Sequence, residues 1–121
     1  MSTGKTWFID IDGTIFVHRT PEELLSGAED EILPDVREFF EQIPSEDTII
    51  LCSARPADLK DSTSDTVDKF GLRYDAIIFD LPSGARIVIN DTKPDGRITA
   101  KSIPLNRNEG CSRVTSLLPY L

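Results

Sequence analysis

The most constraining feature of this sequence is a set of short apolar segments, each followed closely by polar residues. These segments cover residues 6–11, 48–52, 76–79 and 86–90. Continuous apolar runs of this length are typical of strands that are covered on both faces in a parallel sheet. The polar residues then stand at the carboxyl ends of strands, where open α/β sheets bind their ligands.

Helical patterns lie between the first three segments, at residues 34–43 and 56–70, and a further short helix is expected near 112–118. The order strand, helix, strand, helix, strand, strand predicts an α/β fold. We expect a three-layer, Rossmann-like parallel sheet with helices on both faces. A length of 121 residues predicts a single domain, residues 1–121.

The pairing of the last two predicted strands stays open. Only six residues, 80–85, separate them, whereas a parallel crossover usually needs a dozen or more. They form either a hairpin or a parallel pair joined by an extended link across the end of the sheet.

Composition and charge narrow the possible partners. The net charge of −8 disfavours nucleic acid and anionic membranes as partners. No apolar run approaches the roughly 20 residues that span a bilayer, and the first residues lack the features of a secretory signal. We therefore expect a cytoplasmic protein with no membrane contact, whose two cysteines are reduced.

Polar side chains that could bind a ligand or take part in a reaction follow three of the predicted strands. Asp10 and Asp12 end the first, and extended geometry puts them on the same side, about 6 to 7 Å apart. The second strand ends in Ser53, with Arg55 behind it, and the last ends in Asn90 and Asp91, followed by Lys93. Because carboxylate oxygens are ligands that Mg²⁺ prefers, Asp10, Asp12 and Asp91 are the expected metal ligands.

The sequence resembles the haloacid dehalogenase superfamily of phosphatases. The resemblance rests on Asp10-Ile11-Asp12-Gly13-Thr14, on Ser53 in IILCSARP and on Asp91 in IVINDTKP. It covers roughly residues 7–110 and implies a haloacid dehalogenase-like fold. Since only about twenty residues separate the first strand from the first helix, it implies a member without a cap domain.

The resemblance implies a mechanism in which Asp10 attacks phosphorus to form an aspartyl-phosphate. Asp12 would protonate the leaving oxygen and later deprotonate water. Ser53, Lys93, Gly13 and Thr14 would hold the phosphoryl group, and magnesium would be the cofactor. Arg55, Asn90 and Arg107 are possible substrate contacts.

In many relatives a lysine that neutralises the phosphoryl group precedes the last acidic strand. This sequence departs from that pattern, since the loop 81–85 contains no lysine. Arg86 begins the last predicted strand, which puts it about 16 Å from the catalytic end. We expect Lys93 to take this role, ahead of Lys60, Lys101 and Arg55.

The predicted function is a magnesium-dependent phosphatase acting on a small phosphorylated metabolite such as a sugar phosphate. The alternatives are a polynucleotide-end or protein phosphatase, and a non-catalytic phosphate-binding domain of the same fold. Taken singly, the motifs could also be a turn, a helix cap and a loop start. A homo-oligomer in which a neighbour supplies a lid is a further possibility, and the sequence does not name the substrate.

Overall fold

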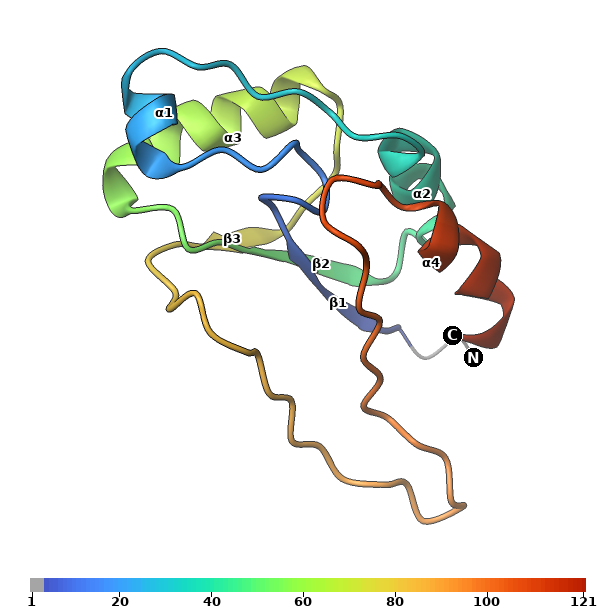
Figure 1. Cartoon of the computed structure of the whole chain (residues 1–121). Coiled ribbons are helices and arrows are strands. Elements are labelled where there is room, and N and C mark those ends of the chain that lie inside the picture. The colour runs from blue at the N-terminus through green and yellow to red at the C-terminus, as the bar shows by residue number, and fades with distance from the viewer. Residues whose placement is uncertain (1–3) are drawn as a thin grey trace.

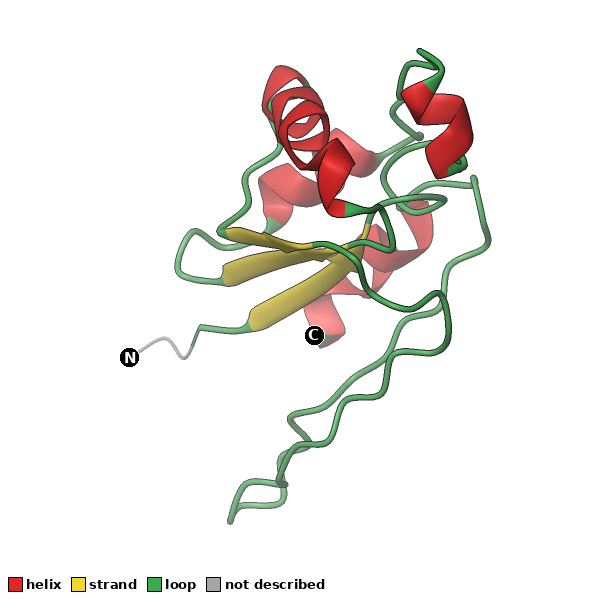
Figure 2. Cartoon of the chain, turned by 90° about the vertical axis from the view of Figure 1, so that its left-hand side faces the viewer, coloured by secondary structure: helices red, strands yellow, loops and turns green. Residues whose placement is uncertain are grey.

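A computed structural model describes residues 4–121 and shows a small α/β fold with a three-stranded parallel sheet (Figures 1 and 2). The strand order is β1-β2-β3. The elements are β1 Thr6–Asp10, α1 Pro21–Leu25, α2 Val36–Gln42, β2 Thr48–Cys52, η1 Ala57–Leu59, α3 Lys60–Lys69, β3 Ala76–Ile78, α4 Ser112–Leu117 and η2 Leu118–Tyr120. In residues 4–121 we find no helix with the length and apolar character to cross a membrane.

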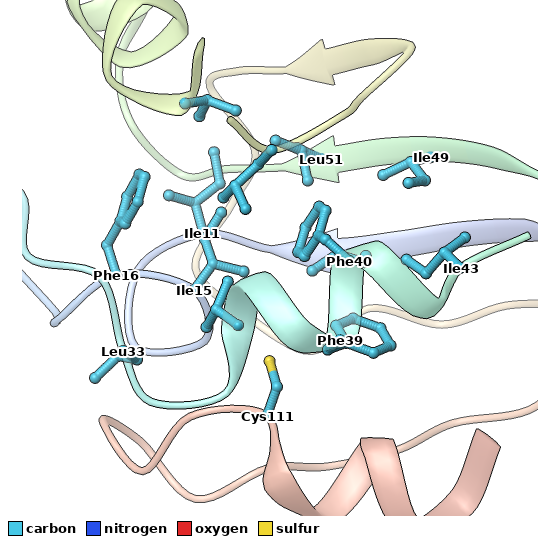
Figure 3. Close-up of a cluster of buried hydrophobic side chains, with 14 of the residues drawn as sticks. Ile11, Ile15, Phe16, Leu33, Phe39, Phe40, Ile43, Ile49, Leu51 and Cys111 are labelled. Atoms are coloured by element: carbon cyan, nitrogen blue, oxygen red, sulfur yellow. The ribbon is translucent and has the colours of Figure 1, made fainter. Parts of the chain in front are cut away.

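The core lies on one face of the sheet. Register pairs Ile9 with Leu51, and these side chains and Ile49 are buried against α2. Figure 3 shows Phe40 of α2 beside the strand side chains of Ile49 and Leu51. Buried apolar residues of α2, α3 and α4 all belong to this one hydrophobic cluster. The helices therefore stabilise the sheet from a single side.

The other face of the sheet is open, which corrects the prediction of helices on both faces. Phe8, Ile50 and Ala76 are neighbours in register, as are Asp10, Cys52 and Ile78. Phe8 is 58% exposed and Ile78 is 43% exposed. The topology explains this, because right-handed crossovers that step in one direction from β1 to β2 to β3 place both connecting helices on the same face.

The strand predicted over residues 86–90 does not form. Residues 79–110 contain no helix or strand, and every residue from 82 to 99 is exposed. This segment leaves the body of the molecule as a long loop (Figure 1). A strand needs a hydrogen-bonded neighbour, and here neither a hairpin with β3 nor a parallel pair with it is made. The apolar run alone was not sufficient evidence for a sheet strand.

A buried carboxylate ties the start of β1 to the start of β2. Asp47 is 3% exposed and accepts hydrogen bonds from the Lys5 backbone N–H (2.9 Å) and the Trp7 indole N–H (2.8 Å). Burial alone would raise the pKa of Asp47, but these hydrogen bonds and the Lys5 ammonium outweigh it and lower the pKa. The ionised carboxylate thus stabilises the end of the sheet where β1 and β2 begin.

Candidate active site

The loop after β1 is a tight turn built around a buried isoleucine. Ile11 is fully buried, and its carbonyl oxygen accepts hydrogen bonds from the N–H groups of Thr14, Ile15 and Phe16. Gly13 has φ of +85° and donates its N–H to the Phe16 carbonyl at 2.7 Å. A positive φ is far easier for glycine than for other residues. The turn leaves the Asp10 and Asp12 side chains at the carboxyl end of β1.

Asp10 is the more accessible of the two carboxylates, with a side chain 36% exposed. One oxygen accepts a hydrogen bond from the Thr14 hydroxyl (3.1 Å) and the other forms an ion pair with the Arg86 guanidinium (2.8 Å). The Thr14 contact restrains the carboxylate, and the half-exposed Arg86 partner puts a cation directly beside it. Asp10 is therefore the carboxylate that this end of the sheet presents to solvent.

Asp12 is held in a buried charge network. The Arg55 side chain, 3% exposed, donates to both oxygens of Asp12, at 3.1 and 2.8 Å, and to both oxygens of Asp30, at 3.1 and 2.7 Å. It also donates to the Thr63 hydroxyl at 3.0 Å. Burial would lower the pKa of Arg55, but hydrogen bonds to Asp12 and Asp30 raise it instead. Arg55 is a permanent cation that fixes the orientation of Asp12.

Arg55 is thus placed at the site but not as a substrate contact. Its guanidinium is fully engaged with protein partners, and its backbone N–H donates to the Ser53 hydroxyl at 2.9 Å. Ser53 follows β2 as predicted but is only 1% exposed. In this conformation the Ser53 side chain stabilises the turn between β2 and α3 and offers little surface to a substrate.

The return segment 106–110 packs over the glycine of the turn. The Asn108 N–H donates to the Gly13 carbonyl at 2.9 Å. The Arg107 side chain lies directly above Gly13, since a β-carbon at that position would stand 3.1 Å from Arg107 Cγ. Arg107 is exposed and, within residues 4–121, has no ion-pair partner. The predicted contact at Arg107 is therefore at the site, with a guanidinium available for an anion.

Three predicted site residues lie elsewhere. Asn90, Asp91 and Lys93 are on the exposed loop, where the Asn90 amide donates to Thr99 and the Asp91 carbonyl accepts from the Thr99 hydroxyl. They were expected at the end of the last predicted strand, at the same end of the sheet as Asp10, and that strand does not form. Lys93 is engaged in a turn at the tip of the loop, so it is not the cation next to Asp10.

Arg86 takes the place that the sequence analysis gave to Lys93. It was expected about 16 Å from the catalytic end because it was counted as the first residue of a strand. With no strand, the chain from β3 brings Arg86 to Asp10. Asp30 was missed altogether, because it lies in an irregular segment between α1 and α2 and no motif marks it. Only its buried contact with Arg55 reveals its role.

The carboxylates do not form the magnesium site that the resemblance implies. Across residues 4–121 no group of three His, Cys, Asp or Glu side chains is placed to hold a metal ion. Both oxygens of Asp12 accept from Arg55, and those of Asp10 accept from Thr14 and Arg86. Mg²⁺ needs a nearly octahedral shell of oxygen ligands. In this arrangement both oxygens of each carboxylate already accept hydrogen bonds from protein groups, and the third expected ligand, Asp91, lies on the exposed loop.

The site is an open edge rather than a deep pocket. Two clefts of the described chain are lined by other residues, one near Phe70 and Leu72 and one of about 540 Å³ that includes Val17 and Asp35. Neither includes Asp10 or Asp12. An open edge with a partly exposed carboxylate ion-paired to Arg86, and with the Arg107 side chain over the adjoining turn, can accept an anionic group carried by molecules of varied size.

Comparisons with family models, with curated proteins and with solved structures gave no match to this chain. The resemblance to the haloacid dehalogenase superfamily therefore rests on the sequence motifs.

Proposed function

We propose that this chain is a phosphatase that hydrolyses phosphomonoesters through an aspartyl-phosphate on Asp10. The observation that carries the proposal is an accessible carboxylate at a strand end that is ion-paired with Arg86, with the Arg107 side chain over Gly13 of the adjoining turn. Carboxylates act as nucleophiles in phosphoryl transfer, and guanidinium groups neutralise the charge of the phosphoryl oxygens. The motifs around Asp10, Asp12 and Ser53 support the same chemistry.

The steps follow from these contacts. A phosphate dianion competes with Asp10 for Arg86, so binding substrate frees the Asp10 oxygen that Arg86 holds in the free protein. That oxygen forms a bond to phosphorus while the bond from phosphorus to the alcohol oxygen breaks, and the alcohol leaves with a proton. In this proposal Asp12 transfers that proton, which it first takes up from solvent, because both of its oxygens accept hydrogen bonds from Arg55 in the free protein. Water then cleaves the acyl-phosphate, releasing inorganic phosphate and restoring Asp10.

The substrate class in this proposal is a small phosphorylated metabolite such as a sugar phosphate. The net charge of −8 supports this class over polynucleotide ends, because like charges repel at long range. The open edge would equally admit a phosphorylated side chain of a protein. A panel of phosphorylated metabolites, a phosphopeptide and a 3′-phosphorylated oligonucleotide separates the three classes by relative kcat/KM.

The proposal is tested by hydrolysis of p-nitrophenyl phosphate, with Asp10→Asn as the principal variant. Loss of the nucleophile should reduce kcat by about 10³-fold or more. Asp65→Asn, an exposed acid on α3, is the matched control and should retain activity. Acid-quenched wild-type protein should carry one phosphoryl group that mass spectrometry places on Asp10. Activity that survives Asp10→Asn refutes the proposal.

Magnesium dependence requires its own measurement. The assay is run with added Mg²⁺ and with a chelator. Activity that depends on the ion means that carboxylate ligands become available when the substrate binds. Equal activity under both conditions means that Arg86 and Arg107 supply the positive charge.

A second candidate is a non-catalytic phosphate-binding domain. Two observations favour it: Arg55 occupies both oxygens of Asp12, and Asp91 is not near Asp10. Such a domain binds inorganic phosphate without turnover of any ester. Calorimetric titration with phosphate, repeated on Arg86→Gln and Arg107→Gln, tests this candidate. Binding that both variants weaken, in the absence of hydrolysis, would favour it over the enzyme.

A further inference from the structure

The exposed loop carries an unusual amount of apolar surface. Ile87 is 82% exposed, Val88 56%, Ile89 92% and Ile98 69%. We call residues 87–101 the arm. It projects from the body of the molecule in both views (Figures 1 and 2). Clustered apolar side chains of this kind on a soluble chain mark a contact surface for another molecule.

The arm has the turn of a β-hairpin without the ladder. The Gly96 N–H donates to the Lys93 carbonyl (2.8 Å), the Lys93 N–H donates to the Arg97 carbonyl (3.0 Å), and Gly96 has φ of +90°. This is a three-residue hairpin loop with glycine in the left-handed position. Between Ile87 and Thr92, no backbone–backbone hydrogen bond to any of residues 4–121 is found. The arm is extended, and outside its turn its peptide groups are available for pairing, apart from the Asp91 and Thr99 carbonyls, which accept side-chain hydrogen bonds.

The body presents a matching surface at β1. This strand is at the edge of the sheet. Within residues 4–121, the backbone of residues 6–10 forms hydrogen bonds with β2 and with no other segment. The face beside that edge is apolar and open, with Phe8 58% exposed and Ile78 43% exposed. We call Phe8, Ile50 and Ile78 the open face. An unpaired edge next to an uncovered apolar face is a template for an added strand.

The distribution of charge indicates which molecule pairs with the edge of β1 and covers the open face. The arm contains three basic residues and two acidic ones, a net charge of +1, which leaves −9 for the rest of a chain whose total is −8. A basic, apolar arm fits an acidic body that has an apolar face. Because the arm points away from its own body (Figure 1), a second copy of the chain is an acidic body with an apolar face that the arm can reach.

We propose that the chain forms a homodimer by arm exchange. The arm of each copy pairs along the free edge of β1 in the other copy and covers its open face. This contact buries apolar side chains that the single chain leaves in water, and it satisfies peptide groups on both edges. The proposal does not depend on the phosphatase assignment.

The test measures mass in solution by light scattering and sedimentation at micromolar concentrations. The wild-type chain should be a dimer. The arm variant Ile87→Asp/Ile89→Asp should weaken dimerisation by about 100-fold or more, because it places two charges in an apolar contact. Phe8→Asp should do the same from the receiving side. Leu25→Asp, on α1 and 61% exposed, is the matched control and should remain dimeric.

Mixing the two monomeric variants tests the exchange itself. An arm variant has an intact open face, and Phe8→Asp has an intact arm, so an equimolar mixture should recover dimers with one intact contact. If Phe8→Asp does not fold, the arm variant still decides, since its two side chains are exposed in the single chain. A monomeric wild-type chain overturns the proposal, as does an arm variant that remains dimeric.

Discussion

Arg55→Met should lower the free energy of unfolding by about 3–5 kcal/mol. In the wild-type chain this buried cation lies between Asp12 and Asp30, whose side chains are 16% and 4% exposed. Methionine fills a similar volume but leaves two nearby carboxylates without their positive partner. The cost is that of unpaired, poorly hydrated negative charges rather than of lost packing.

The magnitude follows from the contacts. Four N–H donors meet carboxylate oxygens at distances of 2.7–3.1 Å, and a hydrogen bond to a charged group contributes about 1.5–3 kcal/mol. Their sum overstates the effect, because burying the guanidinium itself costs free energy, so the smaller figure applies. A domain of this size has a stability of roughly 5–15 kcal/mol. The variant should fold with a Tm lower by roughly 10–20 °C.

The assay is urea unfolding followed by tryptophan fluorescence, because the chain has a single tryptophan, Trp7, packed edge-on against Phe39 at 5.6 Å. Arg37→Met is the matched control, since this arginine is exposed, donates to the Phe70 carbonyl and lies over the Phe70 ring, and it should cost under about 1 kcal/mol. Adding Asp30→Asn to Arg55→Met should recover part of the loss, as coupled residues do. A loss below about 1 kcal/mol for Arg55→Met refutes this account of the network.

Three further predictions concern residues away from Asp10. Asp47→Asn should lower the free energy of unfolding by about 1–3 kcal/mol at pH 7. Because the folded pKa of Asp47 is lowered, its contribution is present above the unfolded pKa near 3.8 and is lost as pH falls through the folded value. The unfolding free energies of wild type and variant should therefore converge in acid. Gly110→Ala should destabilise the fold by more than about 2 kcal/mol, because the added carbon would lie 2.2 Å from the Pro34 carbonyl oxygen. Gly71→Ala, also at positive φ but in open space, is the control and should cost about 1 kcal/mol. Equal losses would contradict the close contact at Gly110. Burial and the neighbouring acid raise the pKa of Cys111 to about 11, so its thiol should react with Ellman's reagent at pH 8 only after denaturant is added, and rapid native labelling would contradict this.

The sequence predicted the elements whose local signals agree with their packing. β2 was predicted over its exact residues, and β1, α2, α3, β3 and α4 within a few residues of their ends. Their apolar spacing is also the spacing of the core contacts. The helix α1 was missed, although Thr20 and Glu23 form a capping box with proline at the first helical position. That motif is a sequence signal that could have identified it.

The predicted positions of site residues agree with the structure where a single strand end determines them. They differ from it where two segments had to meet. Asp10, Asp12 and Ser53 follow β1 and β2, so their positions depend only on local register. Asp91, Asn90 and Lys93 required the segment 86–90 to find a strand partner, which no local pattern guarantees. Because the segment 86–90 forms no strand, Arg86 lies beside Asp10 and Asp91 lies on the exposed loop.

The strand β1 joins the two proposals, because it ends in Asp10 and also presents the free edge that receives the arm. The arm carries Asn90 and Asp91, so arm exchange would move these residues toward the partner's β1. Activity of the monomeric Ile87→Asp/Ile89→Asp variant distinguishes two consequences. Unchanged kcat/KM means that one chain contains a complete site. A loss of activity in proportion to the loss of dimer, reversed when the variant is mixed with Phe8→Asp, means that the arm acts in the partner's site.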